Sequence, residues 1–171
     1  LYQTKTFELV RSEQPQSIST QLLAHQLQGL KWIKDQERKR TVEDVMKANN
    51  TESALFWEKT KTGSGFKNKM TKKISHVAPE YPRGGLLCDV MGLGKTLSLL
   101  AAVVTDCDLG EADYNTLVIC PVSVISNWQK QISEHCSSLK VGCFYGNERQ
   151  TIGDLSKYDI VLTSYDTLRE T

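Results

Sequence analysis

The sequence lacks a long hydrophobic run, a secretory leader and an excess of charge of either sign. No apolar run reaches the roughly 18 residues that a membrane-spanning helix needs, so we expect no membrane segment. The 21 Lys and Arg residues nearly balance the 20 Asp and Glu residues, which leaves a net charge of +1. This balance excludes a uniformly basic nucleic-acid tail and an acidic solvating chain, but it allows a local basic patch. The chain begins at Leu1 with no charged and apolar leader, which predicts no secretory signal and fits a trimmed or partial N-terminus.

The five cysteines form no C-x-x-C pair, which is the spacing that most zinc and thiol redox motifs use. Their number is odd, and Cys88 and Cys120 lie inside apolar runs typical of strands. We therefore expect five reduced thiols in an intracellular protein.

The C-terminal half alternates short apolar runs with helical patterns. Four apolar runs predict strands, at residues 84–88, 116–120, 139–145 and 158–164. Two stretches predict helices, at residues 95–105 and, after a Ser123 cap, at 121–134. Strands that alternate with helices at this spacing form a parallel sheet with helices on its faces.

The N-terminal part is predicted to be helical. Residues 1–19 are polar and indicate a loop, or one short strand at residues 6–10. An apolar stripe over residues 20–40 predicts a helix, with Ser17 and Thr20 as candidate caps. Because Trp32 falls on this stripe, we expect it in the core.

The middle of the chain, residues 41–82, holds few apolar residues and predicts an irregular, mobile insert attached mainly through Phe56 and Trp57. Six lysines and no acidic residue occur between Lys59 and Lys73. A lysine run on a polar insert is more often simply solvated. Contact with DNA phosphates is the alternative, and its candidates are Lys69, Lys72 and Lys73.

The strongest chemical signal is the loop from Asp89 to Thr96, D-V-M-G-L-G-K-T, between a predicted strand and a predicted helix. Glycines let backbone N–H groups close around phosphate oxygens, and the helix N-terminus faces the same anion. We expect Lys95 to reach the outer phosphates and the Thr96 hydroxyl to ligate Mg²⁺. A helix cap that happens to contain Gly-Lys-Thr is the weaker alternative, because the strand–loop–helix context is present on both sides.

Residues 84–96 resemble motif I of the SWI/SNF-type ATPases, which are DNA translocases of helicase superfamily two. That family carries Asp where Asp89 stands, and usually an acidic or polar residue where this chain has Val90. Three further stretches resemble the family's Q motif, motif Ia and motif Ib in the family's order, at residues 22–32, 116–128 and 158–165. The long insert between the Q motif and motif I resembles the helicase-like transcription factor branch, which serves post-replication repair and transcription-linked remodelling. Relatives in that branch often carry a RING finger, and no RING cysteines occur in this chain.

The resemblance implies an α/β fold, a RecA-like P-loop parallel sheet flanked by helices, with a helical N-terminal segment and the irregular insert. It divides the chain into four parts. These are an N-terminal extension (residues 1–19), a Q-motif helix (20–40), the insert (41–82) and the front part of the first RecA-like lobe (83–171). The family's D-E-x-H box and its second lobe with the arginine finger do not occur before Thr171. The sheet is therefore expected to be incomplete, and hydrolysis to need the rest of the protein.

The resemblance also implies ATP and Mg²⁺ as ligands, with adenine read by Gln26. The phosphates would be held by Met91, Gly92, Leu93, Gly94, Lys95 and Thr96. Double-stranded DNA or a nucleosome would be contacted through phosphates, with Ser123, Ser164 and Tyr165 as candidates. The expected location is the nucleus, with no membrane partner.

Each of these residues also has a purely structural alternative role. Gln26 could be a solvated helix residue, Ser123 a plain helix cap, and Ser164 with Tyr165 a strand-end turn. For the whole chain, the alternative is a catalytically inert nucleotide-binding or DNA-docking module. A P-loop kinase or GTPase is disfavoured, because the stretches resembling motifs Ia and Ib have no purpose there.

Overall fold

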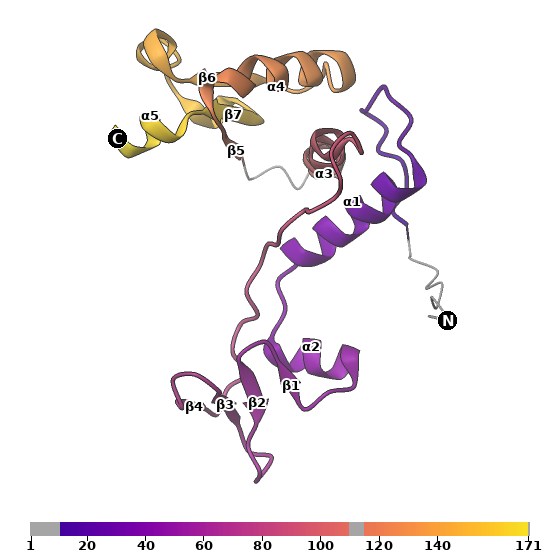
Figure 1. Ribbon diagram of the computed structural model, residues 1–171, viewed down its shortest axis with the longest axis vertical. Helices are drawn as coiled ribbons and strands as arrows, with labels where there is room; N and C mark the ends of the chain where they lie inside the picture. The colour runs from indigo at the N-terminus through magenta and orange to yellow at the C-terminus, as the bar shows by residue number, and fades with distance from the viewer. Residues whose placement is uncertain (1–10, 110–114, 171) are drawn as a thin grey trace. The chain divides into compact units, whose positions relative to one another are not determined.

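The computed structural model describes residues 11–109 and 115–170, which fall into two compact units. Unit 1 combines the chain up to Ile33 with the chain from Leu87 onward, and unit 2 is Lys34–Leu86 (Figure 1). The strand predicted at residues 6–10 lies outside the described residues. Each unit has its own sheet and its own hydrophobic cluster.

Unit 1 contains the predicted parallel sheet. Its strands are β5 (Thr116–Ile119), β6 (Val141–Phe144) and β7 (Ile160–Thr163), in the order β5-β7-β6. All four residues of β7 are buried, as expected of a central strand in a sheet covered on both faces. The expectation of a parallel sheet from alternating strands and helices is therefore confirmed.

Four helices accompany this sheet: α1 (Ala24–Glu37), α3 (Lys95–Asp108), α4 (Val122–His135) and α5 (Tyr165–Glu170). The predicted helices at 95–105 and 121–134 correspond to α3 and α4. The predicted Ser123 cap is wrong, because Pro121 takes the N-cap position of α4 with an extended backbone. Proline fixes φ before the first turn and so starts the helix earlier, which leaves Ser123 exposed within that first turn.

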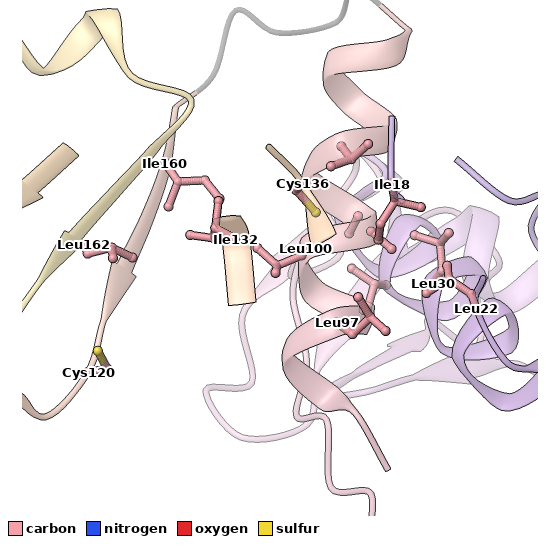
Figure 2. Close-up of a cluster of buried hydrophobic side chains, with 14 of the residues drawn as sticks. Ile18, Leu22, Leu30, Leu97, Leu100, Cys120, Ile132, Cys136, Ile160 and Leu162 are labelled. Atoms are coloured by element: carbon pink, nitrogen blue, oxygen red, sulfur yellow. The ribbon is translucent and has the colours of Figure 1, made fainter. Parts of the chain in front are cut away.

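The core of unit 1 is built around α3. Figure 2 shows Leu97 and Leu100 of α3 between Leu22 and Leu30 on one side and Ile132 of α4 on the other. The same cluster reaches the sheet through Ile160 and Leu162 (Figure 2). Helix α3 therefore connects the N-terminal segment to the α4 and sheet layer.

The N-terminal residues proposed as helix caps have other partners. Ser17 bonds to the carboxylate of Asp108 at the end of α3, through both its backbone N–H and its hydroxyl. The Thr20 hydroxyl lies 2.6 Å from Nδ1 of His135 at the end of α4. The cap predictions were wrong because tertiary partners take these hydroxyls. Trp32 is 38% exposed, so its predicted place in the core is also wrong.

Residues 84–88, predicted as a strand, form no strand in the structure. Leu86 is 84% exposed, and the three strands of the described parallel sheet pair only with one another. An apolar run becomes a strand only when a neighbouring strand satisfies its backbone N–H and C=O groups. Apolar composition alone therefore misled the prediction.

Unit 2 corrects the expectation of an irregular insert. It contains α2 (Val42–Asn49), whose N-terminus has a capping box formed by Thr41 and Asp44. Hydrogen bonds from Thr41 lower the pKa of the Asp44 carboxyl. Four short antiparallel strands then follow in chain order, β1 (Ser53–Ala54), β2 (Trp57–Lys59), β3 (Phe66–Asn68) and β4 (Ile74–Ser75).

A small cluster of its own holds unit 2 together. Its buried members are Val42, Met46, Ala54 and Phe66, with Trp57 partly buried against them. Phe56 is 48% exposed, so the predicted attachment through Phe56 is wrong, whereas Trp57 does pack inward. Two- and three-residue strands carry too little periodic pattern to be found from sequence, which explains the error.

All five cysteines are free thiols, as predicted. Cys120, Cys136 and Cys143 are buried, and burial raises the pKa of the Cys136 thiol to about 11. No helix within residues 11–109 and 115–170 is long and apolar enough to cross a bilayer.

The two phenylalanines of unit 2 provide a test of its core. Phe66→Ala should lower the free energy of unfolding of the sheet by about 3–5 kcal/mol, because it removes a buried ring. Phe56→Ala is the matched control and should change it by less than about 0.5 kcal/mol. Hydrogen exchange of β2 and β3 amides measures both. Rapid exchange across residues 59–73 in the unmodified protein would instead support an irregular insert.

Candidate nucleotide site

The loop with the phosphate-binding pattern leads directly into α3. Gly94 occupies the N-cap position of this helix with φ 74° and ψ 37°, and Gly92 has φ 86°. Residues with a side chain rarely adopt this left-handed backbone conformation, so glycine is the residue that allows the turn. Met91, Gly92 and Leu93 are exposed, while Lys95 and Thr96 in the first helical turn are half-buried.

The Q-motif residues meet this loop although they lie far from it in sequence. The Gln26 side chain, 5% exposed, donates from Nε2 to the Leu93 carbonyl at 3.4 Å. Its Oε1 accepts the backbone N–H of Leu23 at 2.8 Å, which caps the first turn of α1. Gln26 is therefore buried between two elements, and its interpretation as a solvated helix residue is wrong.

His25 joins the same carbonyl oxygen. Its Nε2 lies 3.1 Å from the Leu93 oxygen, and because a carbonyl only accepts, Nε2 must carry the hydrogen. Sequence reasoning gave His25 no role in the site. Its place beside Gln26 at the start of a helix was the signal available. The two donors keep the Leu93 carbonyl oxygen turned toward α1, where it cannot repel an anion on the loop.

The loop and α1 approach so closely that a side chain on Gly94 would displace the Gln26 amide. A Cβ at this position would overlap Nε2 of Gln26, whereas a Cβ on Gly92 meets no atom within 4 Å. Gly94 thus has two roles: it permits the left-handed backbone, and it leaves room for the Gln26 amide.

Lys95 folds back over the loop. Its ammonium group donates to the carbonyl oxygens of Asp89, at 2.8 Å, and Val90, at 3.2 Å. These bonds fix the two ends of the loop against each other. They also place a positive charge beside the exposed backbone of residues 91–93.

The residues fit Mg²⁺ only in part. Thr96 offers one hydroxyl in the first turn of α3, and no group of three His, Cys, Asp or Glu side chains among the described residues could hold a metal ion. Mg²⁺ commonly keeps several waters and binds through one or two protein ligands plus phosphate oxygens. A Mg²⁺ ion here would rely mainly on the nucleotide.

The candidate DNA contacts of unit 1 follow two paired strands. Ile119 of β5 lies opposite Thr163 of β7, so the carboxyl ends of both strands share one edge of the sheet. Ser123 and Tyr165 follow these ends and are exposed. Ser164 is buried, and its hydroxyl accepts the Thr167 N–H at 3.2 Å. A DNA contact at this turn would therefore use Tyr165 or the backbone.

Lys69, Lys72 and Lys73 belong to unit 2, in the turn between β3 and β4. All three are exposed.

Residues 25–171 match the family model of the SNF2-related domain. The chain is 32% identical over 213 residues to an Arabidopsis thaliana protein named SWI/SNF-related matrix-associated actin-dependent regulator of chromatin subfamily A member 3-like 1, covering 94% of this chain and 23% of that one. It is 26% identical to the DNA repair protein RAD5B of the same plant, covering 95% and 16%.

Among solved structures, the chain resembles the Sulfolobus solfataricus SWI2/SNF2 ATPase core in complex with dsDNA. The TM-score is 0.59 at 25% identity, covering 96% of this chain and 25% of that one. The chain belongs to the SNF2-related domain family, and its fold is part of the RecA-like SNF2 ATPase core. It spans a quarter or less of the length of these relatives.

The contact between Gly94 and Gln26 predicts energetic coupling. Gly94→Ala should destabilise α3 by more than the roughly 1–2 kcal/mol that a left-handed alanine costs, because its Cβ also overlaps Gln26. Gly92→Ala is the control, with backbone strain alone. Adding Gln26→Ala removes the overlap, so the double variant should fall short of additivity by about 0.5–3 kcal/mol. Hydrogen exchange of α3 amides measures each value, and strict additivity would contradict the coupling.

Proposed function

We propose that this chain is the ATP-binding portion of an ATP-dependent double-stranded DNA translocase acting in chromatin remodelling or DNA repair. The observation that carries the proposal is the contact of Gln26 with the loop at Leu93 and Gly94. Two motifs far apart in sequence meet at one site, as a nucleotide that spans base and phosphates requires. Family membership and the names of the relatives support the same activity.

In this proposal Gly92 and Gly94 keep the loop backbone open to phosphate oxygens, and the N-terminus of α3 faces the anion. Lys95 exchanges the carbonyl oxygens of Asp89 and Val90 for phosphate oxygens, which are stronger acceptors for an ammonium group. Met91 and Leu93 supply backbone around the phosphates. Thr96 holds Mg²⁺, which neutralises phosphate charge when bound.

Gln26 is proposed to hydrogen-bond to the adenine base through its side-chain amide. An amide can both donate to and accept from adenine, but here its two ends already bond to Leu93 and Leu23. Reading adenine would therefore replace at least one of these bonds. That exchange would couple the base to the conformation of the loop.

Double-stranded DNA, free or on a nucleosome, is proposed to be contacted through its phosphates. Ser123, in the first turn of α4, combines a hydroxyl with the positive end of a helix dipole. Tyr165 offers an exposed hydroxyl after β7. Such contacts carry no base-specific information, which suits a protein that moves along DNA. The expected location is the nucleus.

Turnover is proposed to need parts outside this chain, namely the D-E-x-H box and the second RecA-like lobe with its arginine finger. An arginine finger alone contributes about 10³ to 10⁵ in rate. This chain should therefore bind nucleotide weakly and not hydrolyse it. The alternative, an inert nucleotide-binding or DNA-docking module, predicts that the longer protein hydrolyses no ATP even with DNA present.

Lys95→Ala tests nucleotide binding. Loss of a charge-assisted contact should weaken Mg·ATP binding by about 1.5–3 kcal/mol, measured by calorimetric titration. Lys157→Ala, a change at an exposed lysine outside the loop, is the control and should leave binding unchanged. A phosphate-release assay should show no steady turnover. ATP turnover by this chain that Lys95→Ala abolishes would contradict the proposal that hydrolysis needs parts outside the chain. A folded chain that does not bind Mg·ATP would contradict the proposed site.

Ser123→Asp tests the DNA contact separately from folding. A negative charge in the first turn of α4 should stabilise the helix by about 0.3–1 kcal/mol while repelling a DNA phosphate. Duplex binding, followed by fluorescence anisotropy, should therefore weaken although the melting temperature does not fall. Ser133→Asp adds the same charge near the other end of α4 and should leave duplex binding unchanged. Equal weakening by both variants would argue for a general charge effect.

A further inference from the structure

Two turns at one end of the unit 2 sheet carry exposed apolar side chains beside lysines. In an antiparallel sheet whose strands follow chain order, the first and third turns lie at the same end. The first turn is Leu55–Phe56, and the third is formed by residues 69–73. The Lys69 N–H donates to the Phe56 carbonyl at 2.6 Å, which joins the two turns.

The apolar side chains of these turns are not used by the core of unit 2. Leu55 is 50% exposed, Phe56 48% and Met70 69%. Leu55 also adopts φ 51° and Lys72 φ 62°, in the left-handed region where turns normally carry Gly, Asn or Asp. Bulky residues are thus held, at a conformational cost, where they face solvent.

The lysines beside them have no acidic partner among the residues that the structure describes. Lys69, Lys72 and Lys73 are exposed, and no described carboxylate lies within 4 Å of their ammonium groups, whereas Lys59 of the same sheet pairs with Glu52 at 3.9 Å. The Lys72 ammonium donates to the Lys69 carbonyl at 2.6 Å, which holds the third turn closed. The result is a concentrated positive charge around exposed apolar groups.

We propose that this end of unit 2 binds single-stranded nucleic acid. We name it the lysine tip, and its residues are Leu55, Phe56, Lys69, Met70, Lys72 and Lys73. Bases would stack on the Phe56 ring and contact Met70, while the three lysines neutralise the adjoining phosphates. Aromatic stacking combined with a positive surface is the general means by which proteins hold single strands without reading sequence.

Single-stranded nucleic acid matches the side chains of the lysine tip better than a duplex or an acidic peptide does. A blunt duplex keeps its bases stacked and offers phosphates alone, which would leave the exposed apolar side chains without a role. An acidic peptide would need a pocket for its own apolar residues, and a cavity of unit 2 that could take one is lined by seven residues between Arg38 and Asn49, none of them in the tip. The inference goes beyond the proposed function, because it uses unit 2 alone and requires no nucleotide.

The test uses the full chain without nucleotide and a fluorescein-labelled oligothymidylate, followed by anisotropy at several salt concentrations. Phe56→Ala should weaken binding by at least about fivefold, the lower limit for loss of one stacked base, with little change in the salt slope. Phe56→Tyr keeps the ring and should bind normally. Changing Lys69, Lys72 and Lys73 to Gln together should reduce the slope of log K against log salt by about two. An unlabelled blunt duplex should compete less well than unlabelled oligothymidylate.

Two controls stay within unit 2 but lie outside the tip. Lys61→Gln alters the β2–β3 turn at the opposite end of the sheet, and Val77→Ala removes an exposed apolar side chain beyond β4. Neither should change binding, and all variants should melt like the unmodified protein. Unchanged binding in Phe56→Ala would overturn the base contact. Binding of polyglutamate to the same variants tests for a general polyanion or peptide surface. If the tip variants lose polyglutamate binding as strongly as oligothymidylate binding, the proposal is overturned.

Discussion

The close approach of Gln26 to Gly94 is the constraint on which the candidate site depends. A side chain at position 94 would collide with the Gln26 amide, and without that amide the Leu93 carbonyl would lose one of its two donors. The loop conformation is therefore set from outside the loop, by the first turn of α1. Through these contacts, a change in the loop conformation would alter the packing of the first turn of α1.

Helix α3 extends this constraint into the core. Its first residue, Lys95, closes the loop, while Leu97 and Leu100 are buried among side chains from the N-terminal segment and α4. Burying a leucine side chain contributes roughly 1.5–3 kcal/mol, about as much as one charge-assisted hydrogen bond of the loop, and α3 buries several apolar side chains. The buried side chains of α3 thus hold the helix in the core, and the loop precedes its N-terminal end.

The sequence predicted the parallel sheet, α3 and α4, because each rests on a pattern several residues long, whereas the ligand chemistry of the loop stays a prediction from its motif. It did not predict the unit 2 sheet, whose strands have two or three residues, or the exposed course of residues 84–88, because strand pairing is a tertiary property. One missed signal was readable, since Thr41 followed three residues later by Asp44 resembles the capping-box pattern before α2. The contact of His25 with Leu93 joins residues 68 positions apart, and its local signal was only the place of His25 beside Gln26 at the start of a helix.

The two units differ in which residue types adopt a left-handed backbone conformation, with positive φ. In the described part of unit 1 every residue with positive φ is glycine, including Gly92 and Gly94 of the loop. Non-glycine residues with positive φ occur only in unit 2 among the described residues, namely Asn50, Leu55 and Lys72. A glycine loop can change conformation at little steric cost, which would suit the proposed exchange of Lys95 contacts for phosphate. Leu55 and Lys72 instead hold turns in costly conformations that the sheet must stabilise, so unit 2 presents its exposed side chains on a fixed frame rather than an adaptable one.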